Sequence, residues 1–169
     1  MYIFGDIQMA LKPYREDHIV VPRFCEANGF YTTPERSAMM KRIKAKNSKI
    51  EVKFRRALWN IGLRYRKNVR SLPGIPDIVF RKYRLVIFID GAFWHGYEWE
   101  KRRDQIQSNR EFWIAKIERN IQHDREVNQQ LSDLGWHVER FWEHEIKKEF
   151  HVCVGRVLNY IKEYENRNI

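Results

Sequence analysis

The chain has 169 residues, a length that suits one domain with tails, because single domains cluster near about 100–150 residues. Lysine and arginine number 32 against 22 acidic residues, and the net charge of +10 favours a polyanionic partner, nucleic acid ahead of an anionic membrane. Two cysteines, Cys25 and Cys153, exclude a disulfide-rich scaffold and an all-cysteine zinc finger. No apolar run approaches the roughly 20 residues that cross a bilayer, and the N-terminus is too polar for a secretory signal. We therefore expect a soluble, cytoplasmic protein without a membrane partner.

The first thirty residues show no clear hydrophobic period. Residues 19–21 are apolar and β-branched, which predicts one short strand, and Asn28-Gly29 predicts a turn. We assign residues 1–31 to an N-terminal extension whose role the sequence leaves open.

Two helices are predicted next. Thr33-Pro34-Glu35 is typical of a helix start and predicts a helix to about residue 46. Ser48, with Glu51 three residues later, is a capping-box pattern that opens a second helix, and Gly62 ends it. Apolar residues recur at helical spacing along this second helix: Ile50, Phe54, Ala57, Leu58 and Ile61.

Strands and helices then alternate along the chain. Short apolar segments predict strands over residues 63–67, 77–80, 85–89 and 136–142, while the polar residues 98–107 predict a loop. Apolar periodicity predicts a long helix over residues 110–134 and a final helix over residues 143–164. This order predicts an α/β fold with a mixed central sheet flanked by helices. We place the main domain at residues 32–149 and expect residues 150–169 to form a C-terminal helix packed on it.

The positive charge is concentrated in one part of the sequence. Residues 36–70 contain 13 lysines or arginines and one acid, whereas residues 131–169 contain 6 basic and 7 acidic residues. A basic segment of this kind, interleaved with aromatic residues and methionines, favours contact with a phosphate backbone over a generally basic surface.

Two aspartates stand out in so basic a chain, because each stands at the end of an apolar strand. If Lys82-Tyr83 forms a hairpin loop, Asp77 lies opposite Phe88, and Asp90 lies diagonally across on the same face, with backbones about 7–8 Å apart. Two carboxylates at that distance suit one Mg²⁺, which takes oxygen ligands and activates water against a phosphodiester. Either aspartate alone suits a turn, but the pair together favours a metal site. A register shift of one residue would break this geometry.

Residues near the acidic pair each have two interpretations. His95 suits proton transfer near neutral pH, and its proximity to the aspartates favours that role over a structural one. Glu51 is the N3 residue of the capping box, a metal contact, or both. Phe93 and Trp94 suit core packing as well as insertion between base pairs, and the sequence alone leaves that choice open.

Five blocks of residues occur in the order and spacing of a known family. They are Arg36-Ser37-x-x-Met40-x-x-Ile43 followed by Glu51; Leu72-Pro73-Gly74-x-Pro76-Asp77; Phe88-x-Asp90-Gly91-x-Phe93-Trp94-His95; Phe112-Trp113-x-x-Lys116-x-x-x-Asn120; and Gly135-Trp136-x-Val138-x-x-x-Trp142-Glu143. Each block alone is weakly specific, but together, from about Thr33 to Glu143, they closely resemble the very-short-patch-repair (Vsr) DNA mismatch endonucleases. The resemblance implies a restriction-endonuclease-like PD-(D/E)XK core. It also implies Mg²⁺-dependent nicking of double-stranded DNA beside a T·G mismatch, the product of 5-methylcytosine deamination.

The resemblance also implies roles for residues of the catalytic centre. Asp77 matches the central metal-binding aspartate, and Asp90 falls where members of the family carry His or Asp. Ile89 falls where a backbone carbonyl helps to hold the metal. His95 and Glu51 match the active-site histidine and glutamate.

A second set of residues is implied to contact DNA. Phe93 and Trp94 match an aromatic wedge, and Met40 matches a residue that inserts from the opposite groove. Lys116 and Asn120 match positions on the long helix near the DNA.

The sequence departs from the family at two kinds of position. Ala92 stands where the general PD-(D/E)XK pattern has a lysine, a departure that Vsr proteins share. Many relatives also hold a structural zinc ion, but Ala92, Tyr97, Trp99 and His144 stand at or near the places of its ligands. We therefore expect apolar packing in place of the zinc site.

The expected function is Mg²⁺-dependent nicking beside T·G mismatches in very-short-patch repair, by a monomer, with other mismatch-repair proteins as possible partners. One alternative is a Vsr-like nuclease of a restriction, phage-defence or mobile-element system that has no mismatch preference. Another is a non-catalytic DNA-binding module, although Asp77, Asp90 and His95 together argue against it. A peripheral membrane protein is a weaker alternative, because it gives the acidic pair no purpose.

Overall fold

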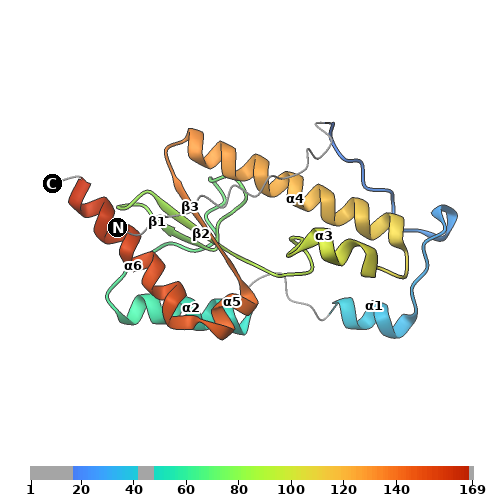
Figure 1. Ribbon diagram of the computed structural model, residues 1–169, viewed down its shortest axis with the longest axis horizontal. Helices are drawn as coiled ribbons and strands as arrows, with labels where there is room; N and C mark the ends of the chain where they lie inside the picture. Colours follow the sequence, from blue (N-terminus) through green and yellow to red (C-terminus); the bar gives the residue numbers. More distant parts are fainter. Residues whose placement is uncertain (1–16, 42–47, 168–169) are drawn as a thin grey trace.

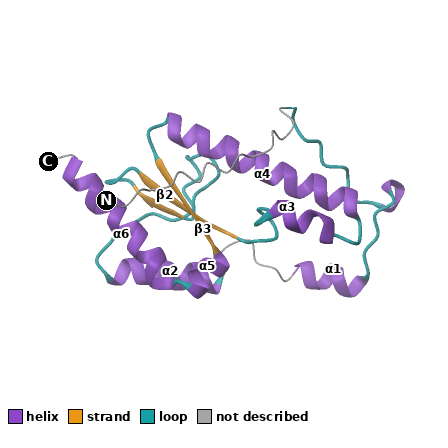
Figure 2. Cartoon of the chain, in the orientation of Figure 1, coloured by secondary structure: helices purple, strands orange, loops and turns teal. Residues whose placement is uncertain are grey.

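A computed structural model describes residues 17–41 and 48–167, and Figures 1 and 2 show their arrangement. The helices are α1 (Pro34–Lys41), α2 (Lys49–Asn60), α3 (Trp99–Arg102), α4 (Arg110–Asp133), α5 (Glu143–Lys148) and α6 (Phe150–Arg167), with 3-10 turns η1 (Glu26–Asn28) and η2 (Arg103–Gln105). The strands are β1 (Ile78–Phe80), β2 (Leu85–Asp90) and β3 (His137–Trp142).

The three strands form one mixed sheet in the order β1-β2-β3. β1 and β2 are antiparallel, with Phe80 opposite Leu85. This is the expected register, but the loop spans residues 81–84 and is longer than the expected two residues, Lys82-Tyr83. β2 and β3 are parallel, because the chain crosses between them through α4. The mixed α/β architecture expected from the sequence is confirmed.

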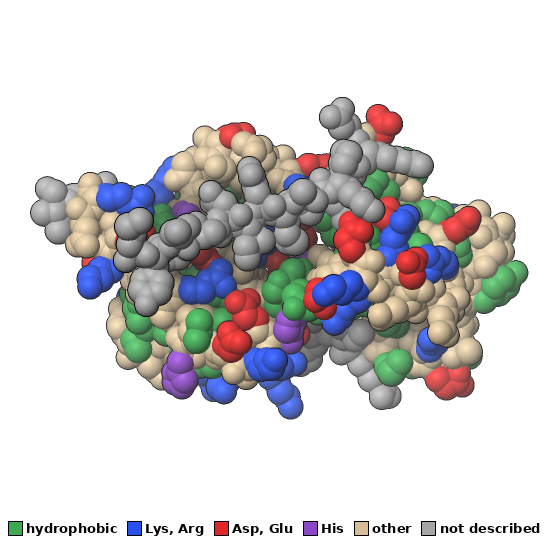
Figure 3. Space-filling view, viewed as in Figure 1, with side chains coloured by type: hydrophobic (Ala, Val, Ile, Leu, Met, Phe, Trp, Pro, Cys, Tyr) green, Lys and Arg blue, Asp and Glu red, His purple; other side chains and the backbone are tan. Residues whose placement is uncertain are grey.

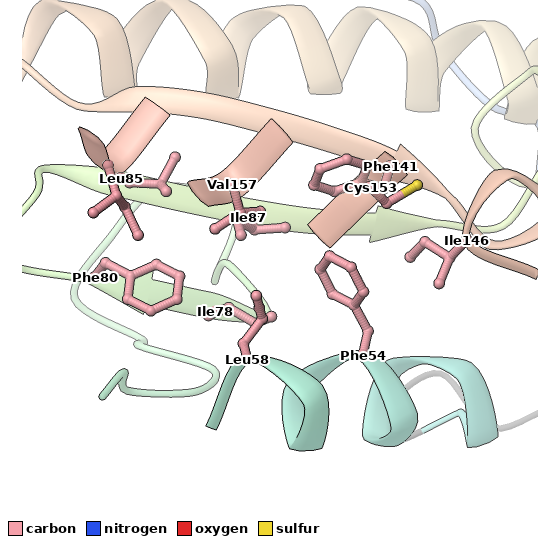
Figure 4. Close-up of a cluster of buried hydrophobic side chains, with 11 residues drawn as sticks. Phe54, Leu58, Ile78, Phe80, Leu85, Ile87, Phe141, Ile146, Cys153 and Val157 are labelled. Atoms are coloured by element: carbon pink, nitrogen blue, oxygen red, sulfur yellow. The ribbon is translucent and has the colours of Figure 1, made fainter. Parts of the chain in front are cut away.

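Helices cover both faces of this sheet (Figure 1). On one face, side chains of α2, α5 and α6 pack against alternate strand residues in a cluster that contains Phe54, Ile87 and Val157 (Figure 4). On the other face, Val127 and Leu131 of α4 pack against the opposite set of strand residues. The period of two along each strand therefore decides which side chains face α4.

The predicted helix starts are confirmed by their capping bonds. The backbone N–H of Arg36 donates to Thr33 Oγ1 at 3.3 Å, and the N–H of Glu51 donates to Ser48 Oγ at 3.2 Å. The predicted end of the first helix, near residue 46, lies outside the described residues.

Four sequence predictions need correction. Residues 63–67 form a single bridge, Arg66 to Val79, because positive φ angles at Gly62 and Asn68 turn the chain on either side. Residues 19–21 form no strand, although the turn at Gly29 is present. The predicted loop over 98–107 contains α3 and η2, anchored by the buried Trp99. The last helix breaks at Glu149, whose φ of −127° separates α5 from α6.

Truncation of Phe54 is expected to show how much the larger core cluster contributes. Its side chain is fully buried and contacts the rings of Phe141 and Phe150. Phe54→Ala should lower the free energy of unfolding by about 3–5 kcal/mol, because it removes buried apolar area and leaves a cavity. Val152→Ala is the control, since Val152 is exposed and its truncation should cost below about 0.5 kcal/mol. Urea unfolding measures both, and equal effects would contradict this assignment of the core.

Candidate active site

The acidic pair lies where two neighbouring strands end. Asp77 directly precedes β1, and Asp90 is the last residue of β2. The register that pairs Ile78 with Ile87 confirms the hairpin from which their proximity was predicted. Just before the start of β1, the Asp77 side chain takes the place of a backbone strand partner, because its Oδ2 accepts a 2.8 Å hydrogen bond from the Ile89 N–H. Sheet geometry thus fixes one carboxylate against the strand that ends in the other.

Asp77 lies in an electrostatic environment that disfavours its ionised form. The pKa of its carboxyl is raised from 3.8 to about 6, mainly by burial and also by the charges of Glu51 and Asp90, while the hydrogen bond from Ile89 acts to lower it. Within the described residues no group donates a hydrogen bond to its second oxygen, Oδ1. A half-buried carboxylate with an uncommitted oxygen beside two other carboxylates is a place where a cation would be stabilised.

The donors present match the chemistry of a hard divalent cation. Asp77, Asp90 and the Ile89 carbonyl offer only oxygen atoms, which Mg²⁺ and Ca²⁺ prefer. Among residues 17–41 and 48–167, no three His, Cys, Asp or Glu side chains gather into a metal cage. Mg²⁺ commonly binds through one or two carboxylates and keeps several waters, so this donor set fits Mg²⁺.

Glu51 faces the same region from α2, and its carboxylate forms a buried ion pair with Arg55 one helical turn later. Its backbone N–H is the one that Ser48 caps. The capping interpretation of Glu51 is confirmed, and the metal contact stays a prediction; the charge of Glu51 also raises the pKa of Asp77. Arg55 acts in the opposite direction on that pKa, and the sequence analysis did not identify it.

His95 is held by a second aspartate that the sequence analysis missed. Its Nδ1 lies 2.7 Å from Asp124 Oδ2 and 3.7 Å from Asp90 Oδ1. Burial lowers the pKa of His95, but the hydrogen bond with Asp124 and the charges of both aspartates outweigh it and raise the pKa above its ordinary value. With Nδ1 bound to a carboxylate, Nε2 is the nitrogen left for proton transfer.

Arg140, on β3, links the two aspartates around His95. Its guanidinium lies 2.8 Å from Asp90 Oδ2 and 3.3 Å from Asp124 Oδ1, and its Nε donates to Asn128 Oδ1 at 2.9 Å. Burial raises the pKa of Asp90, whereas Arg140 and His95 act to lower it, and burial prevails.

The sequence carried a signal for the missed α4 residues. Polar side chains recur every four residues along the helix, at Lys116, Asn120, Asp124 and Asn128. Residues four apart lie on one helix face, so this polar stripe predicts a set of side chains aimed at one place. No comparable pattern in the sequence predicted Arg140, because its contact with Asp90 depends on the pairing of β2 with β3.

The aromatic residues after β2 are positioned at the surface. Phe93 is 48% exposed and packs edge-on against Trp94 and Trp113, with ring centroids 5.2 and 5.5 Å away. Trp94 is half-buried, and its carbonyl accepts a 2.8 Å hydrogen bond from Asn120 Nδ2. Exposure of Phe93 argues against core packing. The Asn120 amide is committed to holding the loop, whereas Lys116 lies on the same stripe without an ion pair or hydrogen bond to the described residues.

A groove of about 690 Å³ lies beside this loop and is lined by Met40 of α1 and by Phe93. Figure 1 places α1 and α3 in the half of the molecule away from α6. The same groove is lined by three cations: Arg36, Lys101 and Arg102. The structure therefore brings Met40 and the exposed aromatic residue to one cleft, with positive charge around it.

Comparison with known proteins decides the family. A sequence model described as DNA mismatch endonuclease Vsr matches residues 28–101. The type II nicking enzyme V.NmeDIP of Neisseria meningitidis serogroup C is 47% identical over 132 residues, which cover 78% of this chain and 89% of that relative. The DNA mismatch endonuclease Vsr of Escherichia coli strain K12 is 38% identical over 109 residues, 64% of this chain and 69% of that relative. The chain belongs to the Vsr family. V.HpaIIP of Haemophilus parainfluenzae, another type II nicking enzyme, is 47% identical over 118 residues, 69% of this chain and 84% of that relative.

Membership of the Vsr family makes this protein a DNA endonuclease related to nicking enzymes, with a restriction-endonuclease-like fold. The resemblance and the fold class expected from the sequence are thereby confirmed. The expectation of a non-catalytic module gives way to an enzyme. None of the described helices is long and apolar enough to span a membrane.

Aromatic residues lie together around Tyr97 and His144, two of the positions that the family resemblance compared with zinc ligands. The rings of Tyr97 and His144 lie 4.3 Å apart, and Trp142 lies 5.1 Å from Tyr97. Trp99 is buried nearby in α3 and donates from Nε1 to Glu118 at 3.3 Å. Ring packing thus holds together the loop after β2 and the start of α5.

Neutralising Asp77 is expected to stabilise the metal-free protein in a pH-dependent way. Because the folded-state pKa is raised from 3.8 to about 6, ionisation of Asp77 costs stability, and the cost develops as the pH rises through this window. Asp77→Asn should therefore raise the unfolding free energy by about 1–3 kcal/mol at pH 8, and by much less at pH 4.5. Urea unfolding in EDTA measures this, with the exposed Asp133→Asn as control. An equal gain at both pH values would show that the carboxylate is not destabilised.

Proposed function

We propose that this Vsr-family endonuclease nicks duplex DNA beside a T·G mismatch in a Mg²⁺-dependent reaction, and so begins very-short-patch repair. The observation that carries the proposal is the loop from Asp90 to His95. Within six residues it brings together the buried Asp90 of the acidic pair, the exposed Phe93 and a histidine with one uncommitted ring nitrogen. Cleavage chemistry and DNA distortion would then act at one step of the duplex.

In this proposal the acidic pair holds the metal. Asp77 would offer Oδ1, since Oδ2 is bonded to Ile89, and Asp90 and the Ile89 carbonyl would complete the protein donors. Mg²⁺, when bound, would polarise the scissile phosphodiester and lower the pKa of a coordinated water. Glu51 would bias the same site toward cations through its charge.

His95 would move the proton of the reaction. Asp124 holds Nδ1, which fixes the ring orientation and leaves Nε2 facing the reactants, as a carboxylate partner does for catalytic histidines generally. Asp124 also stabilises the imidazolium that forms when Nε2 takes a proton. This role needs His95 to gain and lose a proton, and the hydrogen bond with Asp124 favours the protonated form by raising the pKa of His95.

Recognition would rest on opening of the base stack. Phe93, supported by Trp94 and Trp113, would enter the stack from one groove, and Met40 from the other side of the cleft. A mismatched pair costs less to unstack than a matched pair, so a wedge of this kind favours T·G. Arg36, Lys101 and Arg102 would bind phosphates beside the cleft, and Lys116 would face the DNA from α4.

The basic segment, residues 36–70, gives partial support to DNA binding along the cleft. Figure 3 shows Lys and Arg side chains spread over one face with acidic groups among them, without one unbroken basic patch. Residues 42–47, which contain part of the predicted positive segment, lie outside the described residues. We propose monomeric action on double-stranded DNA in the cytoplasm, with other mismatch-repair proteins as later partners.

A nicking assay tests the proposal. The substrates are matched duplexes that carry one T·G pair in many flanking sequences, with the T·A and C·G duplexes alongside, in Mg²⁺ and in EDTA. We expect nicks only beside T·G and only with Mg²⁺. Equal cutting of matched DNA would replace the repair function with that of a restriction or defence nuclease that shares the same chemistry. Cutting in EDTA would remove the metal from the proposal.

Truncation of Phe93 should reduce mismatch preference more than it affects folding. Phe93→Ala removes an exposed ring, so the melting temperature should change little, while kcat/KM on T·G duplexes should fall about 10- to 100-fold because one stacking contact is worth ~1–3 kcal/mol. Leu158→Ala, exposed on α6, is the matched control. An unchanged kcat/KM for Phe93→Ala would assign recognition to other residues.

A further inference from the structure

The position of Arg140 in the sheet makes it unusual. It pairs with Phe88 in the parallel ladder, and Phe88 belongs to the apolar cluster that faces α4. Val138, two residues earlier on the same face, packs against that cluster as expected of a strand residue there. Arg140 thus places a guanidinium between the sheet and α4, where the strand pattern calls for an apolar side chain.

Two of the three polar contacts that the Arg140 side chain makes with described residues are with aspartates beside His95. Its two terminal nitrogens lie against Asp90 and Asp124, its Nε against Asn128, and its guanidinium carbon 4.3 Å from the Phe88 ring centroid. Asp90 Oδ2 is therefore occupied by a cation of the protein itself. Asp77, by contrast, has no ion pair with the described residues.

We propose that Arg140 is a positioning residue that holds the Asp90 carboxylate in the absence of metal and competes with the divalent cation for it. This inference rests on the proposed metal site. A divalent ion that reaches Asp90 must share or displace the Arg140 contact, and it also meets the repulsion of a fixed positive charge. Arg140 thereby weakens metal binding by the DNA-free enzyme, and it keeps Asp90 and Asp124 apart and oriented around His95.

The competition has a functional consequence. Phosphate groups of bound DNA add negative charge next to the pair, so they offset the charge of Arg140 and favour metal entry. Metal binding would then be tighter in the DNA complex than in the free protein. Arg140 would make the enzyme a weak metal binder until substrate is present, which limits cleavage without a properly seated duplex.

Calorimetric titration of the DNA-free protein with Mn²⁺, a spectroscopically useful substitute for Mg²⁺, tests the proposal. Arg140→Gln removes the charge and keeps a polar side chain within reach of Asn128, and we expect its Kd for Mn²⁺ to fall about tenfold. Arg140→Lys keeps the charge and should restore a Kd close to that of the wild type. Asp77→Ala should abolish the binding, which assigns the signal to this site.

Arg156→Gln is the matched control. Arg156 forms two ion pairs, with Glu139 and Glu145, and so resembles Arg140 in valence, but it lies on α6 across the sheet. Its loss should leave Mn²⁺ affinity unchanged, and far-UV circular dichroism checks that each variant is folded. An unchanged or weaker affinity in Arg140→Gln, or no binding in either protein, overturns the competition.

The proposed function and the proposed role of Arg140 are tested by different measurements, so either can be rejected without the other. Nicking of T·G duplexes by the wild-type enzyme tests the function, whereas Mn²⁺ affinity without DNA tests Arg140. Tighter Mn²⁺ binding by Arg140→Gln, together with equal nicking of matched and mismatched DNA by the wild type, would retain the competition and reject the mismatch preference.

Discussion

Asp77→Ala is expected to reduce nicking of a T·G duplex by about 10³-fold or more, because it removes the central carboxylate of the proposed metal site and a metal supplies several kcal/mol of transition-state stabilisation. Asp77 is the carboxylate with an oxygen that no described residue engages, and its neighbours Glu51 and Asp90 raise its pKa. Single-turnover nicking under saturating enzyme measures the chemical step directly. DNA affinity should change by far less than the rate, since the basic residues around the cleft remain.

Two controls make the Asp77 result interpretable. Asp133→Asn alters an exposed carboxylate at the end of α4 and should leave the rate unchanged. Asp77→Asn keeps an oxygen that can accept the Ile89 N–H bond, so it separates the loss of charge from the loss of the strand-end contact. Residual nicking by both Asp77 variants within tenfold of the wild type would place the metal elsewhere.

His95→Ala is expected to lower the nicking rate by about 10²–10⁴-fold, the usual contribution of a general acid or base. Asp124→Asn should have a smaller effect, about 10- to 100-fold, because it leaves the imidazole in place and removes only the group that orients it. Asp124 also raises the pKa of His95. Its loss should therefore move the limb of the pH–rate profile that belongs to His95 to lower pH.

The control for this pair is His123→Ala. His123 stands beside Asp124 on α4, but its ring is exposed and its Nδ1 lies 3.7 Å from Glu126 Oε2. Its truncation should leave rate and pH profile as in the wild type. If Asp124→Asn lowered the rate without moving the profile, the aspartate would act on structure alone and not on the protonation of His95.

Local signals in the sequence predicted most of the elements. Thr33 and Ser48 each cap the start of a helix with a side-chain hydrogen bond. Each bond joins residues three positions apart, so it can be predicted from the local sequence without knowledge of the fold. The hairpin register was predicted from an expected two-residue loop and from alternation. The strand predicted over 63–67 failed because sheet pairing needs a partner, and the backbone at Gly62 and Asn68 turns the segment away after one bridge.

The sequence predicted the site residues that belong to short continuous segments of the chain. Asp77, Asp90, His95 and Phe93 stand at strand ends or in one loop, so spacing and family resemblance identified them. Arg140 contacts Asp90 only because β2 and β3 pair side by side, and its sequence neighbours give no sign of that. Such residues become visible when the sheet is assembled.

The parallel pairing of β2 with β3 has a consequence for how the enzyme acquires activity during folding. Leu85 pairs with His137, so the ladder closes only after the whole of α4 has been spanned. Contacts between residues so far apart in the chain form late and slowly, because the loop entropy must be overcome before they stabilise the structure. The β1–β2 hairpin and α2 can form early, and they carry Asp77, Asp90 and Glu51. The positions of Asp124 and Arg140 around His95 are set only when β3 docks, so we expect a folding chain to form its acidic pair before it has a working catalytic centre.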